Sequence, residues 1–416
     1  MNDISPYRTL AELPAKASPH AEEEVLTTPE QFEQICDEIE ADRVVTFDTE
    51  FVSEGYFRPR LCLLQFGTLS RLVTVDPFTC GPLDRAWKIL CDPTILKIIH
   101  GGREEIRFCL DAYGRPQNMI DVQVAQAFVG RSFPMAYKVI CQKAIGVEIG
   151  NHETRTDWSK RPLSRRQVRY AIEDVEHLLP IAQVQARQLR KLDRTSWAEE
   201  EFERLIDTVE TEPDRDNFRR VSGINRLRGA ELAVADTLYQ HRRAEAERLN
   251  KPIKQILRDD LIIDIARRQP RTQTELFHTR GMSRKFNDRT AEIVIDLVRQ
   301  ATSLPKSEWP TLPRPPKAGP GDETLTKLLQ LALCDRCADL NVALSIVGSQ
   351  ADIQDVVRIH TAGSRHSNGR AAKLLEGWRQ EVCGTLLTDL IEGRISVRVR
   401  DAKTASPLIF ETAEPS

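Results

Sequence analysis

The chain has 416 residues, more than a single hydrophobic core usually serves, so we expect two to four domains. Hydrophobic residues at 40%, charged residues at 29% and aromatic residues at 6% argue against wholesale disorder, collagen-like repeats and a disulfide scaffold. No apolar run is long enough for a membrane span, and the N-terminus lacks a basic-then-apolar signal pattern. We therefore expect a cytoplasmic protein with no membrane partner.

The net charge of −3 conceals an uneven distribution of charge along the chain. Residues 215–300 contain 19 Lys and Arg against 12 Asp and Glu, while the remainder is acidic. A basic block of this kind is typical of a segment that meets phosphate backbones, although a solvated helix face would give the same count. The nine cysteines are scattered through apolar runs, where cysteine acts as a small hydrophobe, and they predict no disulfides.

The first half of the chain alternates strand and helix patterns. Residues 1–22 are polar and lack periodicity, which predicts a flexible tail. A helix is predicted after Thr28-Pro29-Glu30, and from Leu83 onward further helices alternate with short strands. The strand-like runs are 44–47, 61–66, 71–76 and 97–100. Together they predict one α/β domain over residues 23–205.

Beyond this domain the apolar spacing becomes helical. Residues 215–302 predict an all-α module, and residues 303–322, rich in Pro, predict a semi-rigid linker. A second helical module is predicted over residues 323–412, with a strand or extended segment at 395–399.

Two acidic motifs are candidates for chemistry. Asp48 and Glu50 follow the apolar run 44–47, and because side chains alternate along a strand they project from the same face. Two such carboxylates repel each other unless a cation lies between them, and hard oxygen ligands suit Mg²⁺ or Mn²⁺. Tyr170 and Asp174 are four residues apart in a helical pattern, so a phenol and a carboxylate share one helix face.

Five sequence motifs follow one another along the chain, in this order: DTEF, HGGREEIRFC, IDVQVAQAF, RTDWSKRPLS and YAIEDVEHLLP. Together they resemble the RNase D family of DEDD exonucleases, in the subtype with tyrosine in the third motif. The resemblance covers about residues 24–200 and implies an α/β, RNase H-like mixed-sheet 3′-5′ exonuclease domain. Residues 215–302 resemble an HRDC domain, and residues 323–412 resemble a more degenerate HRDC-like module, so two all-α domains are expected to follow.

The resemblance implies hydrolysis of phosphodiesters from RNA 3′ ends with two divalent metal ions, Mg²⁺ or Mn²⁺. By motif, the implied metal ligands are Asp48, Glu50, Glu105 and Asp174, and Tyr170 would orient the attacking water. The family has aspartate where this chain has Glu105, which lengthens the arm by one methylene.

The implied substrate is RNA with a single-stranded 3′ end, such as a tRNA precursor, and a monomer is favoured. The candidate RNA contacts are His100, Trp158, Arg161, Arg226, Arg228, Arg242 and Arg243. Two alternatives stay open: a catalytically impaired nucleic-acid-binding protein, marked by Glu105, and a DNA 3′-5′ exonuclease.

Overall fold

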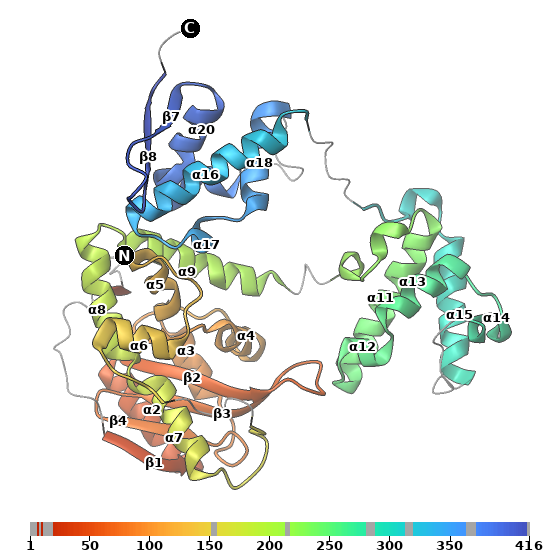
Figure 1. The fold of residues 1–416 in the computed structure, drawn as a ribbon. Helices are drawn as coiled ribbons and strands as arrows, with labels where there is room; N and C mark the ends of the chain where they lie inside the picture. The colour runs from red at the N-terminus through yellow and green to blue at the C-terminus, as the bar shows by residue number, and fades with distance from the viewer. Residues whose placement is uncertain are drawn as a thin grey trace.

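The protein is known from a computed structural model, which describes residues 6–7, 10, 20–150, 156–212, 217–279, 288–312, 319–362 and 372–413. The first part of the chain forms an α/β domain around a six-stranded sheet (Figure 1). In spatial order its strands are β1 (His20–Leu26), β4 (Arg71–Val75), β3 (Arg60–Gly67), β2 (Val44–Val52), β5 (Leu96–Ile99) and β6 (Met119–Asp121). β3 is antiparallel to both neighbours, whereas the other pairs are parallel, so the predicted mixed sheet is confirmed.

Strand β2 lies in the interior of this sheet, with helices on both of its faces. Thr46 donates its hydroxyl to the carbonyl of Val175, whereas Thr49 donates its hydroxyl to Glu105. Because residues three apart on a strand point to opposite faces, the helices that carry Val175 and Glu105 cover opposite sides of β2. The helices of this domain are α2 (Pro29–Asp42), α3 (Asp84–Cys91), α4 (Arg103–Ala112), α5 (Val122–Val129), α6 (Tyr137–Ile145), α7 (Arg165–Glu176), α8 (Leu178–Lys191) and α9 (Thr195–Glu210).

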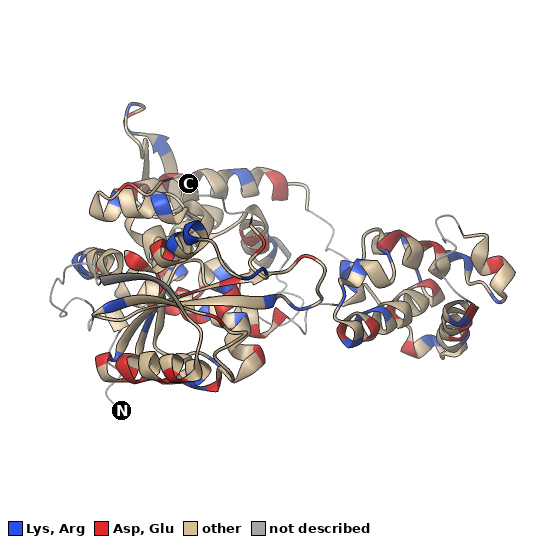
Figure 2. Ribbon diagram, turned by 90° about the horizontal axis from the view of Figure 1, so that it is seen from below, with Lys and Arg blue, Asp and Glu red and all other residues tan. Residues whose placement is uncertain are grey.

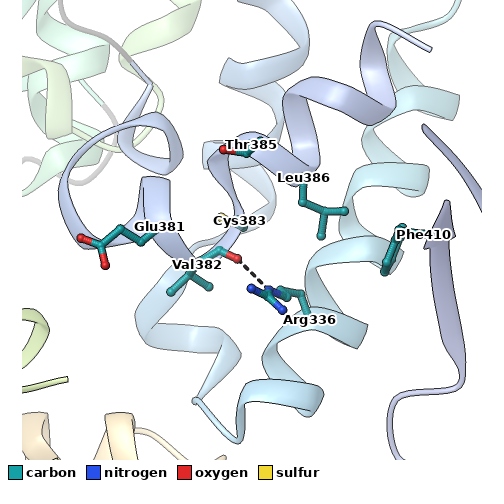
Figure 3. A pocket seen from close by; sticks show the side chains of 7 residues that line it. All are labelled: Arg336, Glu381, Val382, Cys383, Thr385, Leu386 and Phe410. Carbon is teal, nitrogen blue, oxygen red and sulfur yellow. Dashed lines mark hydrogen bonds between the residues drawn. The ribbon is translucent and has the colours of Figure 1, made fainter. Parts of the chain in front are cut away.

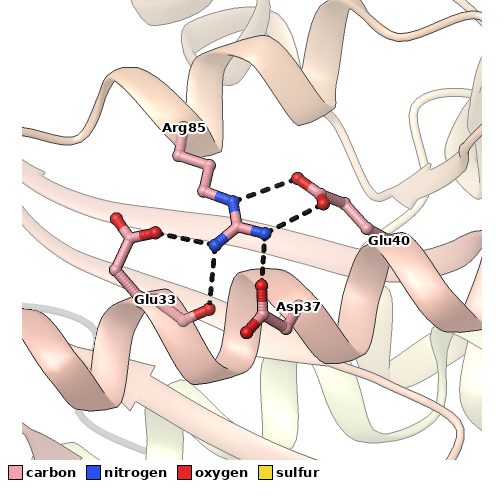
Figure 4. Close-up of polar contacts among 4 residues, drawn as sticks. All are labelled: Glu33, Asp37, Glu40 and Arg85. Carbon is pink, nitrogen blue, oxygen red and sulfur yellow. Dashed lines mark hydrogen bonds and ion pairs between the residues drawn. The ribbon is translucent and has the colours of Figure 1, made fainter.

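Helix α2 begins where the sequence predicts it, because Thr28 caps it and exchanges hydrogen bonds with Gln31 in a capping box. Its outer face is acidic and is held by a single arginine of α3 (Figure 4). The Arg85 guanidinium donates to the carboxylates of Glu33, Asp37 and Glu40. One cation thus offsets the repulsion among three acids on neighbouring turns and fastens α3 to α2.

The N-terminal segment departs from the sequence-based prediction. A flexible tail is predicted over residues 1–22, but Tyr7 and Leu10 are fully buried in the core of the α/β domain and β1 already begins at His20. The prediction is wrong for these described residues because the buried aromatic and aliphatic side chains are too few to produce a periodic pattern.

The module predicted over residues 215–302 is helical and has its own hydrophobic core. Its main helices are α11 (Ala230–Leu249), α12 (Ile253–Ile256), α13 (Asp259–Arg268), α14 (Gln273–Phe277) and α15 (Asp288–Ser303). The loop between β2 and β3 contacts it, since the side-chain oxygen of Asn250 accepts hydrogen bonds from the amides of Phe57 and Arg58, both at 3.2 Å. Arg58 also forms an ion pair with Glu247 at 2.8 Å.

The C-terminal module shares its hydrophobic core with the α/β domain. Its main elements are α16 (Asp322–Leu340), α17 (Leu344–Val347), α18 (Gln350–Ala362), α19 (Gly377–Arg379), α20 (Thr385–Ile391), β7 (Ile395–Val399) and β8 (Leu408–Thr412). Trp197 of α9 stacks on Trp378 of α19 with ring centroids 5.8 Å apart, and buried Arg194 donates to the carbonyls of Phe128 and Leu340. The two parts therefore form one folded body.

The C-terminal module is not helical throughout. The segment at 395–399 is a strand, as one of the two sequence-based alternatives holds, and it pairs antiparallel with β8. The module therefore ends in a β-hairpin. Among the helices that the structure describes, none is long and apolar enough to cross a membrane.

Candidate active site

Strand β2 places the first acidic pair. Asp48 and Glu50 are half-buried and line the same cavity, whereas Thr49 between them is buried and faces the other side of the strand. The alternation predicted from the sequence is thus confirmed. Both carboxylates lie on the face of β2 that Thr46 shares with α7, which carries the second pair.

Helix α7 supplies the second pair. It begins at a capping box between Ser164 and Gln167 and ends at Glu176, before Pro180 in the first turn of α8. Tyr170 and Asp174 lie one turn apart, and the phenol donates a hydrogen bond to the carboxylate. The helix period therefore brings a proton donor and an acidic group to the cavity that Asp48 lines.

Glu105 stands apart from the other acids of the predicted set. It lies in the first turn of α4 and is only 5% exposed, and its carboxylate accepts a 2.5 Å hydrogen bond from the Thr49 hydroxyl. It is not among the residues that line the cavity with Asp48 and Glu50. The structure thus brings Glu105 beside the site, but holds it against the opposite face of β2.

The cavity has a volume of about 420 Å³. It opens between β2, α7 and the start of α6, and is large enough for one nucleotide-sized group. Its lining residues are Asp48, Glu50, His100, Ala136, Tyr137, Lys138, Ile149, Gly150, Tyr170, Glu173 and Asp174.

The electrostatics of the acidic cluster reflect burial and mutual repulsion. Burial, followed by the charges of Glu105, Asp174 and Glu50, raises the pKa of Asp48 well above its ordinary value. Burial and the charges of Asp174 and Glu105 raise the pKa of Glu50 to about 8. Burial likewise raises the pKa of both Glu105 and Asp174 to about 7. The fold therefore gathers acidic groups whose charged forms it does not itself compensate.

The donor set fits hard divalent cations. Carboxylate oxygens are the ligands that Mg²⁺ and Mn²⁺ prefer, and a cation would relieve the repulsion that raises these pKa values. Within the described part of the chain, no group of three or more His, Cys, Asp or Glu side chains is arranged to hold a metal ion as it stands. The bond from Thr49 holds the Glu105 carboxylate in its present position.

Two of the predicted RNA contacts in this domain have structural roles instead. Trp158 is 3% exposed and packs against Tyr170 with ring centroids 6.0 Å apart, so it cannot stack on a base. Arg161 donates five hydrogen bonds, to both oxygens of buried Asp76 and to the carbonyls of Trp158, Lys160 and Cys62. Five bonds use every donor of a guanidinium, which leaves none for a phosphate. Trp158 thus packs behind Tyr170, and Arg161 holds Asp76 and the carbonyl of Trp158. RNA contact by these two residues stays a prediction.

His100 is the third predicted contact and does line the cavity. Its Nε2 lies 3.0 Å from the carbonyl of Met135, and its ring contacts Tyr137 with centroids 5.4 Å apart. The side chain is thereby held in place at the cavity wall.

The basic residues of the helical module are less available for binding RNA than their number suggests. Figure 2 shows Lys and Arg interleaved with Asp and Glu over these helices. Arg242 is 3% exposed, forms a 2.7 Å ion pair with Asp259 and donates to the carbonyl of Leu257, so these protein groups occupy its guanidinium. Arg226 and Arg228 are exposed and Arg243 is half-buried, so these three remain predicted contacts.

Three polar cavity residues are missed by the sequence analysis: Tyr137, Lys138 and Glu173. Tyr137 and Lys138 begin α6, outside every acidic motif, so only proximity in the fold reveals them.

A second cavity, of about 280 Å³, lies in the C-terminal module beside Arg336 and Phe410 (Figure 3). There Arg336 donates to the carbonyl of Val382, and no acidic pair lines the space, so the first cavity is the candidate active site.

The residues that line this cavity lie within a segment that matches a known family. Residues 24–190 match the 3′-5′ exonuclease family, and residues 231–298 match the HRDC domain family. Ribonuclease D of Sphingobium indicum is 31% identical over 387 residues, covering 91% of this chain and 97% of that protein. Ribonuclease D of Acidiphilium cryptum is 32% identical over 397 residues, covering 92% and 97% respectively.

Solved structures extend the likeness to the whole architecture. The crystal structure of Escherichia coli RNase D, described as an exoribonuclease involved in structured RNA processing, superposes with a TM-score of 0.78. It is 26% identical, and the match covers 89% of this chain and 98% of that one. A protein from Bifidobacterium adolescentis shares the fold at a TM-score of 0.68 and 19% identity, covering 90% of this chain and 100% of that chain.

Proposed function

The chain belongs to the ribonuclease D family, and from this premise we propose that it is a metal-dependent exoribonuclease acting on RNA 3′ ends. The observation that carries the proposal is the meeting of Asp48, Glu50, Tyr170 and Asp174 at one cavity, from two elements more than 100 residues apart. A merely structural role gives no reason to gather mutually repelling carboxylates in a half-buried place.

We propose that Asp48, Glu50 and Asp174 bind two divalent cations, Mg²⁺ or Mn²⁺. When bound, such cations supply Lewis acidity, which activates water and stabilises charge on the entering and leaving oxygens of the phosphodiester. The carboxylates hold the ions and, once neutralised, no longer repel the phosphate. Tyr170, which is tied to Asp174 and backed by Trp158, orients the attacking water with its hydroxyl.

Glu105 has a supporting role in this proposal. Its bond to Thr49 and its place outside the cavity lining support an action through bound waters rather than direct ligation. The longer glutamate arm is tolerable in such a role, because an outer ligand does not need the geometry of a direct one.

RNA with a single-stranded 3′ end, such as a tRNA precursor, is the proposed substrate. The HRDC module, with exposed Arg226 and Arg228, is proposed to add affinity through phosphate contacts. We propose that the active form is a monomer.

The test is degradation of a 5′-labelled single-stranded RNA in Mg²⁺, Mn²⁺ or EDTA. We expect metal-dependent shortening from the 3′ end and a loss of rate of more than about 100-fold in Asp48→Asn, because changes to outer-shell partners alone cost about 10- to 100-fold. Asp84→Asn, which removes the same charge at an exposed position in the first turn of α3, is the matched control and should keep full activity.

The alternatives give different results in the same assay. A catalytically impaired RNA-binding protein would bind the RNA without shortening it, and would gain activity only in Glu105→Asp. A DNA exonuclease would shorten a single-stranded DNA of the same sequence at least as fast as the RNA.

A further inference from the structure

A buried glutamine lies on the strand next to the acidic pair of β2. Gln65 of β3 is fully buried, and it is paired with Asp48 in the antiparallel register of β2 and β3. Residues paired in this way project from the same face of a sheet, with their Cβ atoms about 4.5 to 5.5 Å apart. The Gln65 side chain is therefore the lateral neighbour of the Asp48 side chain.

The residues around Gln65 show which face of the sheet this is. A Cβ atom placed on Gly67, two residues further along β3, would collide with the hydroxyl oxygen of Thr46. That hydroxyl donates to the carbonyl of Val175 in α7. Because side chains two residues apart on a strand share a face, Gln65 projects towards α7, which packs against β3. This is the side of the sheet on which the acidic pair of β2 lines the cavity.

The side-chain amide of Gln65 is unpaired. Within the described part of the chain, neither its nitrogen nor its oxygen has a hydrogen-bond partner. An unpaired buried amide is unfavourable, and native proteins rarely retain one without a role for it. Gln65 is not among the residues that line the cavity, so the cavity residue through which it can act is its neighbour Asp48.

Asp48 offers an acceptor for this amide. Among the described residues only the amide of Thr49 donates to the Asp48 carboxylate, to Oδ1 at 2.9 Å. The two oxygens of a carboxylate have about four lone-pair sites, so one site can accept from Gln65 while others hold a cation. Carboxylates that bind metal ions are themselves held by hydrogen bonds from outer groups, which fix the direction of their lone pairs.

We propose that Gln65 is a positioning residue for the metal site, whose side-chain NH2 group donates to the Asp48 carboxylate and orients it towards a bound cation. The proposal rests on the proposed function, because it takes Asp48 to be a metal ligand. A neutral amide leaves the carboxylate its full negative charge, whereas a cationic side chain at this place would offset that charge. Gln65 thus orients the ligand without weakening its attraction for the cation.

The role predicts different effects on stability and on metal affinity. Gln65→Met keeps the length of the side chain but removes the amide. In EDTA its Tm should equal or exceed that of the wild type, because an unpaired buried amide is removed and no hydrogen bond is lost. Its affinity for Mn²⁺, measured by isothermal titration calorimetry without RNA, should fall about 10-fold or more, as is usual for outer partners of metal ligands. A merely structural role would lower the Tm and leave the affinity unchanged.

Gln185→Met is the matched control. Gln185 of α8 is also fully buried, but its amide donates to the carbonyl of Val122 and to the side chain of Gln126. It is not among the residues that line the cavity. Its replacement should therefore lower the Tm in EDTA and leave the affinity for Mn²⁺ equal to that of the wild type.

The metal dependence of the rate gives a second readout. The Mn²⁺ concentration that supports half of the maximal rate of RNA shortening should rise by about 10-fold or more in Gln65→Met. At saturating Mn²⁺ the KM for RNA should stay within about twofold of the wild-type value, because the substrate contacts are intact. Gln65→Leu, a second apolar variant, should behave in the same way. Failure of both variants to fold would contradict the expected Tm and overturn the proposal.

Failure of this proposal differs from failure of the proposed function. Asp48→Asn shows whether the measured Mn²⁺ binds through Asp48. If Asp48→Asn weakens binding but Gln65→Met binds as the wild type does, the role of Gln65 is refuted and the metal site stands. If Gln65→Met weakens binding although the wild type leaves RNA intact, the role of Gln65 is supported and the proposed function fails. Mn²⁺ binding that Asp48→Asn leaves unchanged overturns both.

Discussion

The buried charge of Glu105 should make the metal-free protein less stable as the pH rises. Burial raises the pKa of Glu105 from 4.5 to about 7. Below pH 4.5 the side chain is protonated in both the folded and the unfolded states, so it has no effect. Between pH 4.5 and 7 only the unfolded state gives up the proton, so stability falls, and above pH 7 the loss is complete.

The size of the effect follows from the raised pKa. One pKa unit corresponds to about 1.4 kcal/mol, so charging Glu105 lowers the free energy of unfolding by about 3 kcal/mol above pH 7. For a domain of this size that is a Tm difference of about 6 to 12 °C. Glu105→Gln keeps the shape of the side chain and an acceptor for the Thr49 hydroxyl, but removes the charge.

The assay is thermal unfolding in EDTA from pH 4.5 to 9, followed by circular dichroism. We expect the Tm of Glu105→Gln to exceed that of the wild type increasingly up to pH 7 and by a constant amount above it. Addition of Mg²⁺ or Mn²⁺ should reduce the difference in Tm between Glu105→Gln and the wild type. Glu104→Gln is the control, because Glu104 already pairs with Arg107 at 2.8 Å and its loss should bring no gain. Parallel curves for the wild type and Glu105→Gln at all pH values would refute the reasoning.

Three further predictions concern the contacts that hold the site and the domains. Arg161→Met leaves the carboxylate of Asp76, which is 3% exposed, buried without its cation, and should lower stability by about 3 kcal/mol in chemical denaturation; a loss below about 1 kcal/mol would contradict this role. Trp378→Ala opens the core between the C-terminal module and α9 and should cost about 3 to 5 kcal/mol, read out as faster proteolytic release of that module; unchanged proteolysis would count against a shared core. The double variant Arg58→Ala and Asn250→Ala removes these hydrogen bonds and the ion pair between the β2–β3 loop and the HRDC module. Small-angle scattering should then report a larger radius of gyration, while the rate of degradation of a short RNA stays the same. An unchanged radius would show that these contacts do not hold the module in place.

The periodicities of strands and helices were sufficient to predict much of the fold and the positions of the acidic residues. The alternation along β2 is enough to place Asp48 and Glu50 on one face, and one helical turn is enough to place Tyr170 beside Asp174. The mixed sheet and the helical modules follow from the same periodicities, because burial on one face forces that spacing on each element.

Roles that depend on distant neighbours could not be inferred in this way. The sequence alone predicts Trp158 and Arg161 as RNA contacts. In the structure Trp158 is buried, and the guanidinium of Arg161 donates its hydrogen bonds to Asp76 and nearby carbonyls. Arg242 is a similar case, since its partner Asp259 lies in another helix. Burial and pairing depend on which elements pack together, and a charge count along the chain contains no such information.

The sequence by itself determined the order of the motifs, the element that carries each acid and the face of that element to which it belongs. Only the tertiary structure decided that Glu105 meets Thr49 behind β2, that the C-terminal module shares the core of the α/β domain, and that Lys138 lines the same cavity as the acids. The reason is physical. Periodicity is set by the few residues of one turn or pleat, whereas these three outcomes arise where segments far apart in the chain exclude water together.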